Sequence, residues 1–171
     1  MFAKIKSRLS SMSTIKSLCL HAERHALSDQ QRQPGAEHFL LAALDLPDQT
    51  ARQAFESVGA DAATLRSAIS RQYDDALQSL GIDPEVAGMN DPVAEPLATH
   101  RGLYDASASG KQIMRSLAES RQTHDPLLGA HVVAAVATMR HGVTARALRA
   151  MGIDAERLKS AAEEISMRTN H

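Results

Sequence analysis

The sequence predicts an all-α fold made of two repeats of four short helices, related by a pseudo-twofold axis. The composition is typical of helices, because alanine and long aliphatic residues dominate the 43% hydrophobic content while tryptophan is absent and aromatic residues make up 3%. Apolar residues recur at intervals of three and four, which is the period of a buried helix face. The third observation is an internal repeat, in which residues 93 positions apart match.

The length of the chain and its cysteine content further narrow the kind of protein that the sequence describes. A chain of 171 residues forms one globular unit or two small ones, and it is long enough to fold without a metal or a disulfide. The only cysteine, Cys19, lies on a predicted core face, where we expect an inert thiol, and it gives no sign of an oxidising compartment. These features favour a cytoplasmic location.

Two kinds of partner are disfavoured by the sequence. No apolar run approaches the roughly 20 residues that a bilayer requires, so we expect no membrane span. The chain carries 19 basic and 20 acidic side chains, and it therefore lacks the net positive charge expected of a nucleic-acid-binding protein. We expect the partners to be proteins or peptides.

The repeat sets the predicted organisation of the chain. Matched pairs include His38 with His131, Phe55 with Leu148, Gly59 with Gly152 and Asp61 with Asp154. We divide the chain into a basic lead-in (1–12), a first repeat (13–80), a linker (81–104), a second repeat (105–165) and a tail (166–171). The linker contains Pro84, Pro92 and Pro96, which disfavour long regular structure.

The first repeat is predicted to begin with a helix from about Ser13 to Leu27. Its buried stripe consists of Ile15, Leu18, Cys19 and Ala22. The residues before this helix are basic and rich in serine, as in an organellar transit peptide. Because the core stripe begins so early, we favour a structural helix with a loose basic lead-in, and a targeting segment is the alternative.

The second helix should be the buried centre of the repeat. It begins near Ala36 after a Pro-Gly pair and is apolar on several sides. Thr50 is the expected N-cap of a third helix, and Gly59 is the expected left-handed residue after its end. Asp61 then caps a fourth helix, which Gly81 ends. The predicted core of this repeat consists of Leu40, Leu41, Leu44, Phe55, Val58 and Leu65.

The second repeat is expected to follow the same order. Gly129 precedes its central helix, Gly142 precedes its third helix, and Gly152 with Asp154 separates the third helix from the fourth. We expect a second core made of Val133, Val136, Leu148, Met151 and Leu158.

Motifs for catalysis or metal binding are incomplete. Residues 109–111, Ser-Gly-Lys, resemble the end of a phosphate-binding loop, but Asp105 replaces its first glycine and Gln112 its serine or threonine. His21 and His25 have the spacing of a metal pair on a helix, yet no third ligand is evident, so we interpret them as exposed helix residues. No nucleophile has an adjacent base. We therefore expect no enzymatic activity, no metal and no cofactor.

His38 and His131 occupy equivalent places at the start of the two central helices. A symmetric structural role explains this best, in which each partly buried ring bonds backbone carbonyls or water near the helix start. A functional role for either histidine alone is the alternative.

Residues 35–44, Gly-Ala-Glu-His-Phe-Leu-Leu-Ala-Ala-Leu, are followed by Val-Gly-Ala-Asp at 58–61. Together they resemble the signature of the Clp amino-terminal domain, the substrate- and adaptor-docking module of the Hsp100 unfoldases ClpA, ClpB and ClpC. The resemblance covers about 13–165 and is closer in the first repeat. It implies two four-helix repeats that perform no chemistry. It also implies binding to substrate proteins, adaptors or a Clp unfoldase or protease, as an accessory factor or a decoy.

The resemblance further implies a partner-binding residue. In the ClpC branch, the glutamate of each Gly-Thr-Glu-His motif contributes to a pocket for phosphorylated arginine. Glu37 matches this position in the first repeat, whereas Ala130 replaces it in the second. We favour the interpretation in which the Glu37 carboxylate only stabilises the helix start; the alternative is one cation site per chain, with this carboxylate facing partly outward and binding a partner's guanidinium. If this carboxylate only stabilises the helix start, its loss would change stability and not binding.

The alternative function is a small helical transcriptional regulator or DNA-binding protein. Paired short helices with glycine turns imitate a helix-turn-helix. The helix that opens at Glu37 is acidic at its start and then apolar, which is unlike a recognition helix. The sequence therefore favours the protein-binding function.

Overall fold

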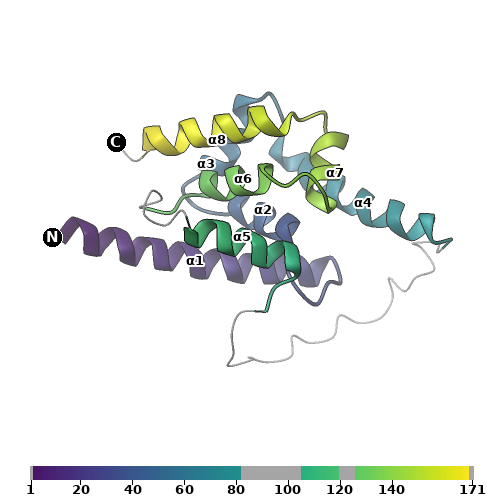
Figure 1. Cartoon of the computed structure of the whole chain (residues 1–171), viewed down its shortest axis with the longest axis horizontal. Coiled ribbons are helices and arrows are strands. Elements are labelled where there is room, and N and C mark those ends of the chain that lie inside the picture. Colours follow the sequence, from purple (N-terminus) through teal and green to yellow (C-terminus); the bar gives the residue numbers. More distant parts are fainter. Residues whose placement is uncertain (1, 82–104, 120–125, 170–171) are drawn as a thin grey trace.

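A computed structural model describes residues 2–81, 105–119 and 126–169, with the side chains from residue 10 onward. Within these ranges the chain forms eight α-helices and one 3-10 helix, and it contains no strand (Figure 1). The predicted all-α fold is confirmed. The predicted linker over 81–104 lies outside the described residues apart from Gly81.

Each half of the chain contributes four α-helices in the predicted order. The first half contains α1 (Phe2–Ser28), α2 (Ala36–Leu44), α3 (Thr50–Ser57), the 3-10 turn η1 (Ala62–Thr64) and α4 (Leu65–Ser79). The second half contains α5 (Ala108–Glu119), α6 (Gly129–Ala137), α7 (Val143–Ala150) and α8 (Ala155–Thr169). No described helix is long and apolar enough to cross a membrane.

Two helix ends differ from the expectation. Helix α1 begins at Phe2 rather than Ser13, so the segment expected to be a loose lead-in is helical. Part of this segment is anchored, because the buried hydroxyl of Ser11 accepts the N–H of Leu127 at 3.1 Å. Helix α8 continues to Thr169, beyond the expected end of the repeat at residue 165.

Most of the predicted turn signals are confirmed. Gly59 and Gly152 have φ angles of 74° and 71°, the left-handed conformation expected after a helix end. Asp61 and Asp154 each accept a backbone N–H two residues further on, at 2.8 and 2.9 Å. The repeated Gly-x-Asp pattern therefore ends one helix and starts the next in both halves.

The predicted cap of the third helix is wrong. Thr50 is the first residue of α3, and Asp48 accepts its N–H at 2.9 Å and its hydroxyl at 2.5 Å. The Thr50 hydroxyl accepts the N–H of Ala130 at 2.8 Å, and Asp48 accepts the N–H of Gly129 at 3.1 Å. Two side chains of the first repeat therefore cap α6 in the second repeat.

The second repeat caps α2 in return. The hydroxyl of Ser109 accepts the N–H of Ala36 at 3.1 Å, and the N–H of Ser107 donates to the carbonyl of Pro34 at 3.1 Å. Gly110 permits this approach, because a Cβ there would clash with the Pro34 carbonyl oxygen. The segment that resembles a phosphate-binding loop thus holds α5 against the start of α2.

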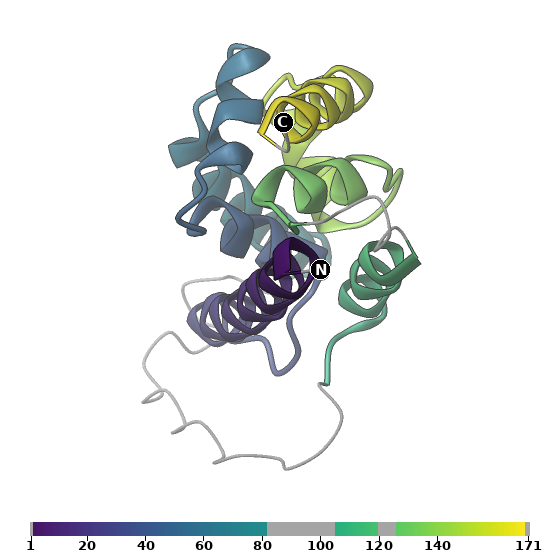
Figure 2. The same cartoon turned by 90° about the vertical axis from the view of Figure 1, so that its left-hand side faces the viewer.

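The buried core is continuous across the two repeats, so the prediction of two separate cores is wrong. Helix α3 packs against α8, and α4 packs against α7. The third helix of each repeat therefore packs against the fourth helix of the other repeat. This reciprocal packing is what a pseudo-twofold relation produces. Helices α2 and α6 meet at the centre, and α1 and α8 lie on opposite sides of them (Figures 1 and 2). Of the predicted core residues, Val58 and Met151 are half-buried and the others are buried.

Candidate partner-binding site

The two repeated histidines have the same structural role. Nδ1 of His38 accepts the N–H of Gly35 at 2.8 Å, and Nδ1 of His131 accepts the N–H of Leu128 at 3.0 Å. Each ring therefore satisfies a backbone donor at the start of a central helix. The structural interpretation is confirmed, but the ring accepts from an amide where we expected a carbonyl or water.

Glu37 lies in the first turn of α2 and is buried, with 8% of its surface exposed. The hydroxyl of Tyr73, on α4, donates to Glu37 Oε1 at 2.7 Å. The alternative in which this carboxylate faces partly outward is therefore wrong. The partial positive charge of the α2 N-terminus also favours a carboxylate at this position.

Tyr73 remains a hydrogen-bond donor at physiological pH. Burial raises the pKa of Tyr73 above its ordinary value, and the negative charge of Glu37 raises it further. The hydroxyl is therefore protonated and donates to the carboxylate. A cationic partner at Glu37 Oε1 would compete with this donor.

Charged side chains extend from this site to α1. Nε2 of His38 lies 3.2 Å from Asp29 Oδ2, which is an electrostatic contact rather than a well-aligned hydrogen bond. Arg66 donates to Asp29 Oδ1 at 3.1 Å and also contacts Nδ1 of His25. Because arginine only donates, His25 carries its proton on Nε2, which donates to Asp45 at 2.7 Å. The chain of contacts thus ties α4 and α2 to α1.

The helix pair His21 and His25 is half-buried rather than exposed, so that expectation is wrong. Burial lowers the pKa of His25 below its ordinary value of 6.5, and the bond to Asp45 opposes this shift. No three His, Cys, Asp or Glu side chains are placed to hold a metal ion in the described part of the chain. Cys19 is half-buried, whereas a core position was expected.

The second repeat fills the equivalent space in another way. A Cβ at Gly35 would clash with the Glu37 carboxylate, so a larger residue at this position would have to displace the carboxylate from its place. In the second repeat the same two positions are Leu128 and Ala130, and both are buried. The leucine side chain is compatible with this position because no carboxylate follows it. The carboxylate is therefore a feature of the first repeat alone.

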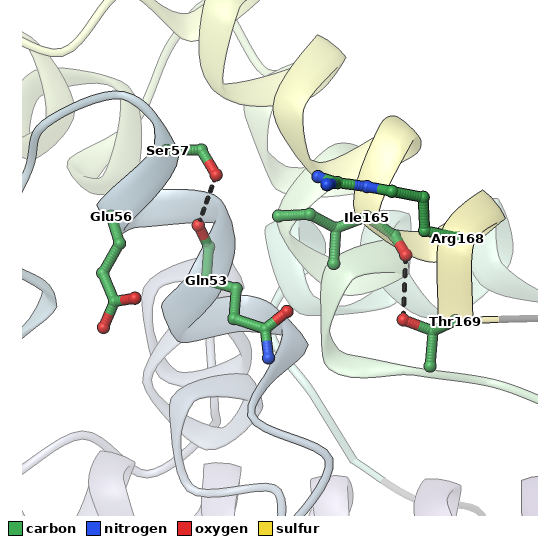
Figure 3. Close-up of a pocket in the computed structure, with 6 residues that line it drawn as sticks. All are labelled: Gln53, Glu56, Ser57, Ile165, Arg168 and Thr169. Carbon is green, nitrogen blue, oxygen red and sulfur yellow. Dashed lines mark hydrogen bonds between the residues drawn. The ribbon is translucent and has the colours of Figure 1, made fainter.

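A second candidate site is a surface groove between α3 and α8 (Figure 3). One part, of about 520 Å³, is lined by Gln53, Glu56 and Ser57 of α3 and by Ile165, Arg168 and Thr169 of α8. A neighbouring part of about 440 Å³ shares Ser57 and is lined by further α8 residues, among them Glu156, Arg157 and Glu164. The groove therefore follows α8 for most of its length.

The chemistry of this groove suits a polar polypeptide. Figure 3 shows Glu56 and Arg168 on opposite walls. The Ser57 hydroxyl donates to the Gln53 carbonyl at 2.8 Å, and the Thr169 hydroxyl donates to the Ile165 carbonyl at 2.9 Å. Both hydroxyls are therefore engaged by the backbone. Sites for small molecules are usually enclosed and mostly apolar, which this groove is not.

The corresponding surface between α4 and α7 carries the opposite charges. At the 93-position offset, Arg149 corresponds to Glu56, and Asp75 corresponds to Arg168. On this side Arg146 donates to Gln72 at 3.2 Å. The two related surfaces therefore differ in the sign of charge on each wall, and a partner can distinguish them.

Sequence reasoning missed Tyr73 as the partner of Glu37, and it missed the groove. The two residues are 36 positions apart on different helices. The groove joins α3 of one repeat to α8 of the other, and the internal repeat shows which residues correspond but not which helices touch. Neither the contact between Tyr73 and Glu37 nor the groove carries a local sequence signal.

Comparison with known protein families gives a match for this chain. The family model described as Clp repeat (R) N-terminal domain matches residues 14–96. Over these residues the match confirms the resemblance seen in the sequence, and this part of the chain carries a Clp-type amino-terminal module; the resemblance of the second repeat stays a prediction. Modules of this family generally take part in protein interaction and are not catalytic. None of the curated proteins compared with the chain matches it.

Proposed function

We propose that this chain is a non-catalytic protein-binding module that acts in the cytoplasm. Its proposed partners are substrate proteins, adaptors, or a Clp unfoldase or protease, which it serves as an accessory factor or as a decoy. The observation that carries this proposal is the α3–α8 groove, an open polar surface with opposite charges on its two walls.

The groove offers both attachment and orientation to a polypeptide. Glu56 and Arg168 are exposed on the two walls, where a partner can reach them, whereas Ile165 between them is 3% exposed and belongs to the core. Opposite charges on opposite walls favour one direction of a bound segment over the reverse. Charge of this kind gives specificity more than affinity, which suits a module that exchanges partners.

Glu37 is the second proposed contact. The guanidinium of a partner would replace the Tyr73 hydroxyl and form a two-pronged, charge-assisted contact with the carboxylate. Ala130 offers no such group, so the proposal gives one cation site per chain.

The DNA-binding alternative receives less support from the geometry. All nine residues of α2 are buried, and so are eight of the nine residues of α6. A recognition helix must expose a face to the major groove. The central helices instead form the core, and this supports a protein partner.

The test is affinity capture from a lysate of the source organism with the immobilised chain, followed by mass spectrometry. We expect retention of Clp unfoldase or protease subunits, with reduced retention by Arg168→Glu. Arg149→Glu is the matched control, because it reverses an exposed arginine on α7, away from the groove. Retention of no substrate protein, adaptor or Clp subunit, or hydrolysis of ATP or peptides by the purified chain, would contradict the proposal.

A further inference from the structure

Helix α1 has an exposed apolar stripe in addition to the face that packs on the core. Met12, Leu20 and Leu27 are 60%, 52% and 39% exposed. With about 100° of rotation per residue, these three positions and the intervening Lys16 and Glu23 lie within an arc of about 80°. We call these five residues the α1 stripe.

The α1 stripe is the main exposed apolar feature of the described residues. Among all the described residues, five large apolar side chains are exposed, and three of these five belong to the stripe. In Figure 2, which looks along α1, the other described helices lie above or beside it and none lies below. Apolar residues gathered on one surface mark an interaction site more often than scattered ones do.

The order of charges in the stripe identifies the partner. We propose that a second copy of this chain covers the α1 stripe, with the two α1 helices antiparallel about a twofold axis near Leu20. In this pair Met12 lies opposite Leu27 of the partner subunit, and Lys16 lies opposite Glu23 of the partner subunit. Leu20 meets the same residue of its partner at the axis. Each contact therefore occurs twice, as a twofold interface requires.

The parallel arrangement is disfavoured by the same residues. It would place Lys16 opposite Lys16 of the partner subunit and Glu23 opposite Glu23 of the partner subunit, and like charges that lie opposite each other repel. The antiparallel arrangement converts both repulsions into attractions and keeps the three apolar residues together. The stripe is thus complementary to itself in one direction only.

The dimer would leave the α3–α8 groove open. Helices α1 and α8 lie on opposite sides of the domain in both views (Figures 1 and 2). Two grooves would therefore face away from the interface, and a partner with several binding segments could engage both. Linking two sites in this way raises the overall affinity without any new contact.

The test is sedimentation velocity of the full chain over a range of concentrations. We expect a reversible dimer with a dissociation constant of about 10–100 μM, because one pair of helices forms an interface at the small end of specific contacts. Leu20→Glu should weaken association at least about tenfold, since it places two like charges at the axis. The control is Leu80→Glu, at a residue that is 74% exposed beyond the end of α4, and it should leave association unchanged. A wild-type chain that stays monomeric at about 1 mM, or a dimer unaffected by Leu20→Glu, would overturn the proposal.

Charge reversal tests the direction of the pair. Lys16→Glu and Glu23→Lys should each weaken self-association, and a mixture of the two variants should form a heterodimer with restored affinity. The double variant should also recover, because its charges are again complementary. Lys16 and Glu23 are exposed, so circular dichroism should show all variants folded. Failure of both the mixture and the double variant to recover would overturn the antiparallel arrangement.

Discussion

The hydrogen bond between Tyr73 and Glu37 controls how accessible this carboxylate is to a partner. Tyr73→Phe removes one donor at 2.7 Å from a charged acceptor and keeps the ring. Hydrogen bonds to charged groups contribute about 1.5–3 kcal/mol, and because Tyr73 is only half-buried we expect a loss of about 1.5 kcal/mol in the free energy of unfolding. The carboxylate keeps the helix-dipole contribution of about 0.3–1 kcal/mol, which limits the loss.

Glu37→Gln completes a double-mutant cycle. Glutamine keeps an acceptor oxygen for Tyr73 but removes the charge, so the hydrogen bond should weaken and the unfolding free energy should fall by about 1 kcal/mol. Tyr73→Phe should then cost less in the Glu37→Gln background, with a coupling of about 1 kcal/mol. Urea denaturation of the four proteins measures this coupling. Losses that add within about 0.3 kcal/mol would show that the two side chains do not interact.

The same variants separate stability from binding. If Glu37 binds a partner's guanidinium, Tyr73→Phe should tighten binding of an arginine-containing peptide, because the competing donor is absent. Glu37→Gln should weaken it by about 1–3 kcal/mol. Titration calorimetry should give one site per chain. Two equivalent sites, or affinity indifferent to Glu37→Gln, would refute Glu37 as the partner-binding residue.

Three further outcomes can be measured by denaturation. Phe55→Ala should cost about 3–5 kcal/mol, because Phe55 is fully buried in the shared core, and a loss below about 2 kcal/mol would contradict that burial. Asp48→Ala should cost about 1–3 kcal/mol, since it removes the acceptor that joins α3 to the start of α6, and Asp48→Asn should cost less. Burial lowers the pKa of His25, so the unfolded chain binds more protons near pH 6. Stability should therefore be complete above pH 6.5 and fall as the pH decreases toward the lower folded-state pKa, and His25→Gln should flatten this part of the profile.

The elements of the fold follow from local signals in the sequence. Gly59 and Gly152 occupy left-handed positions that glycine adopts without steric cost, and the aspartate two residues later caps the next helix. These signals act within a few residues, so they are visible without knowledge of the rest of the chain. The helical spacing of apolar residues likewise identified the buried central helices.

The contacts between elements could not be derived in this way. Thr50 was expected to cap its own helix, but its hydroxyl instead accepts the N–H of Ala130 in the other repeat. The burial of Glu37 depends on Tyr73 from another helix. Such contacts are decided by how the two repeats pack against each other. Because the third helix of each repeat packs against the fourth helix of the other, the two expected cores form one continuous core.

The most direct test of the proposed partner-binding groove is amide hydrogen exchange of the chain with and without a purified Clp unfoldase. We expect slower exchange in the presence of the unfoldase over the C-terminal part of α3, around Glu56, and over the last turns of α8, around Arg168. Arg168→Glu should abolish this protection, and Arg149→Glu should retain it. Unchanged exchange over both helices, or protection confined to α4 and α7, would contradict the groove as the site of partner binding.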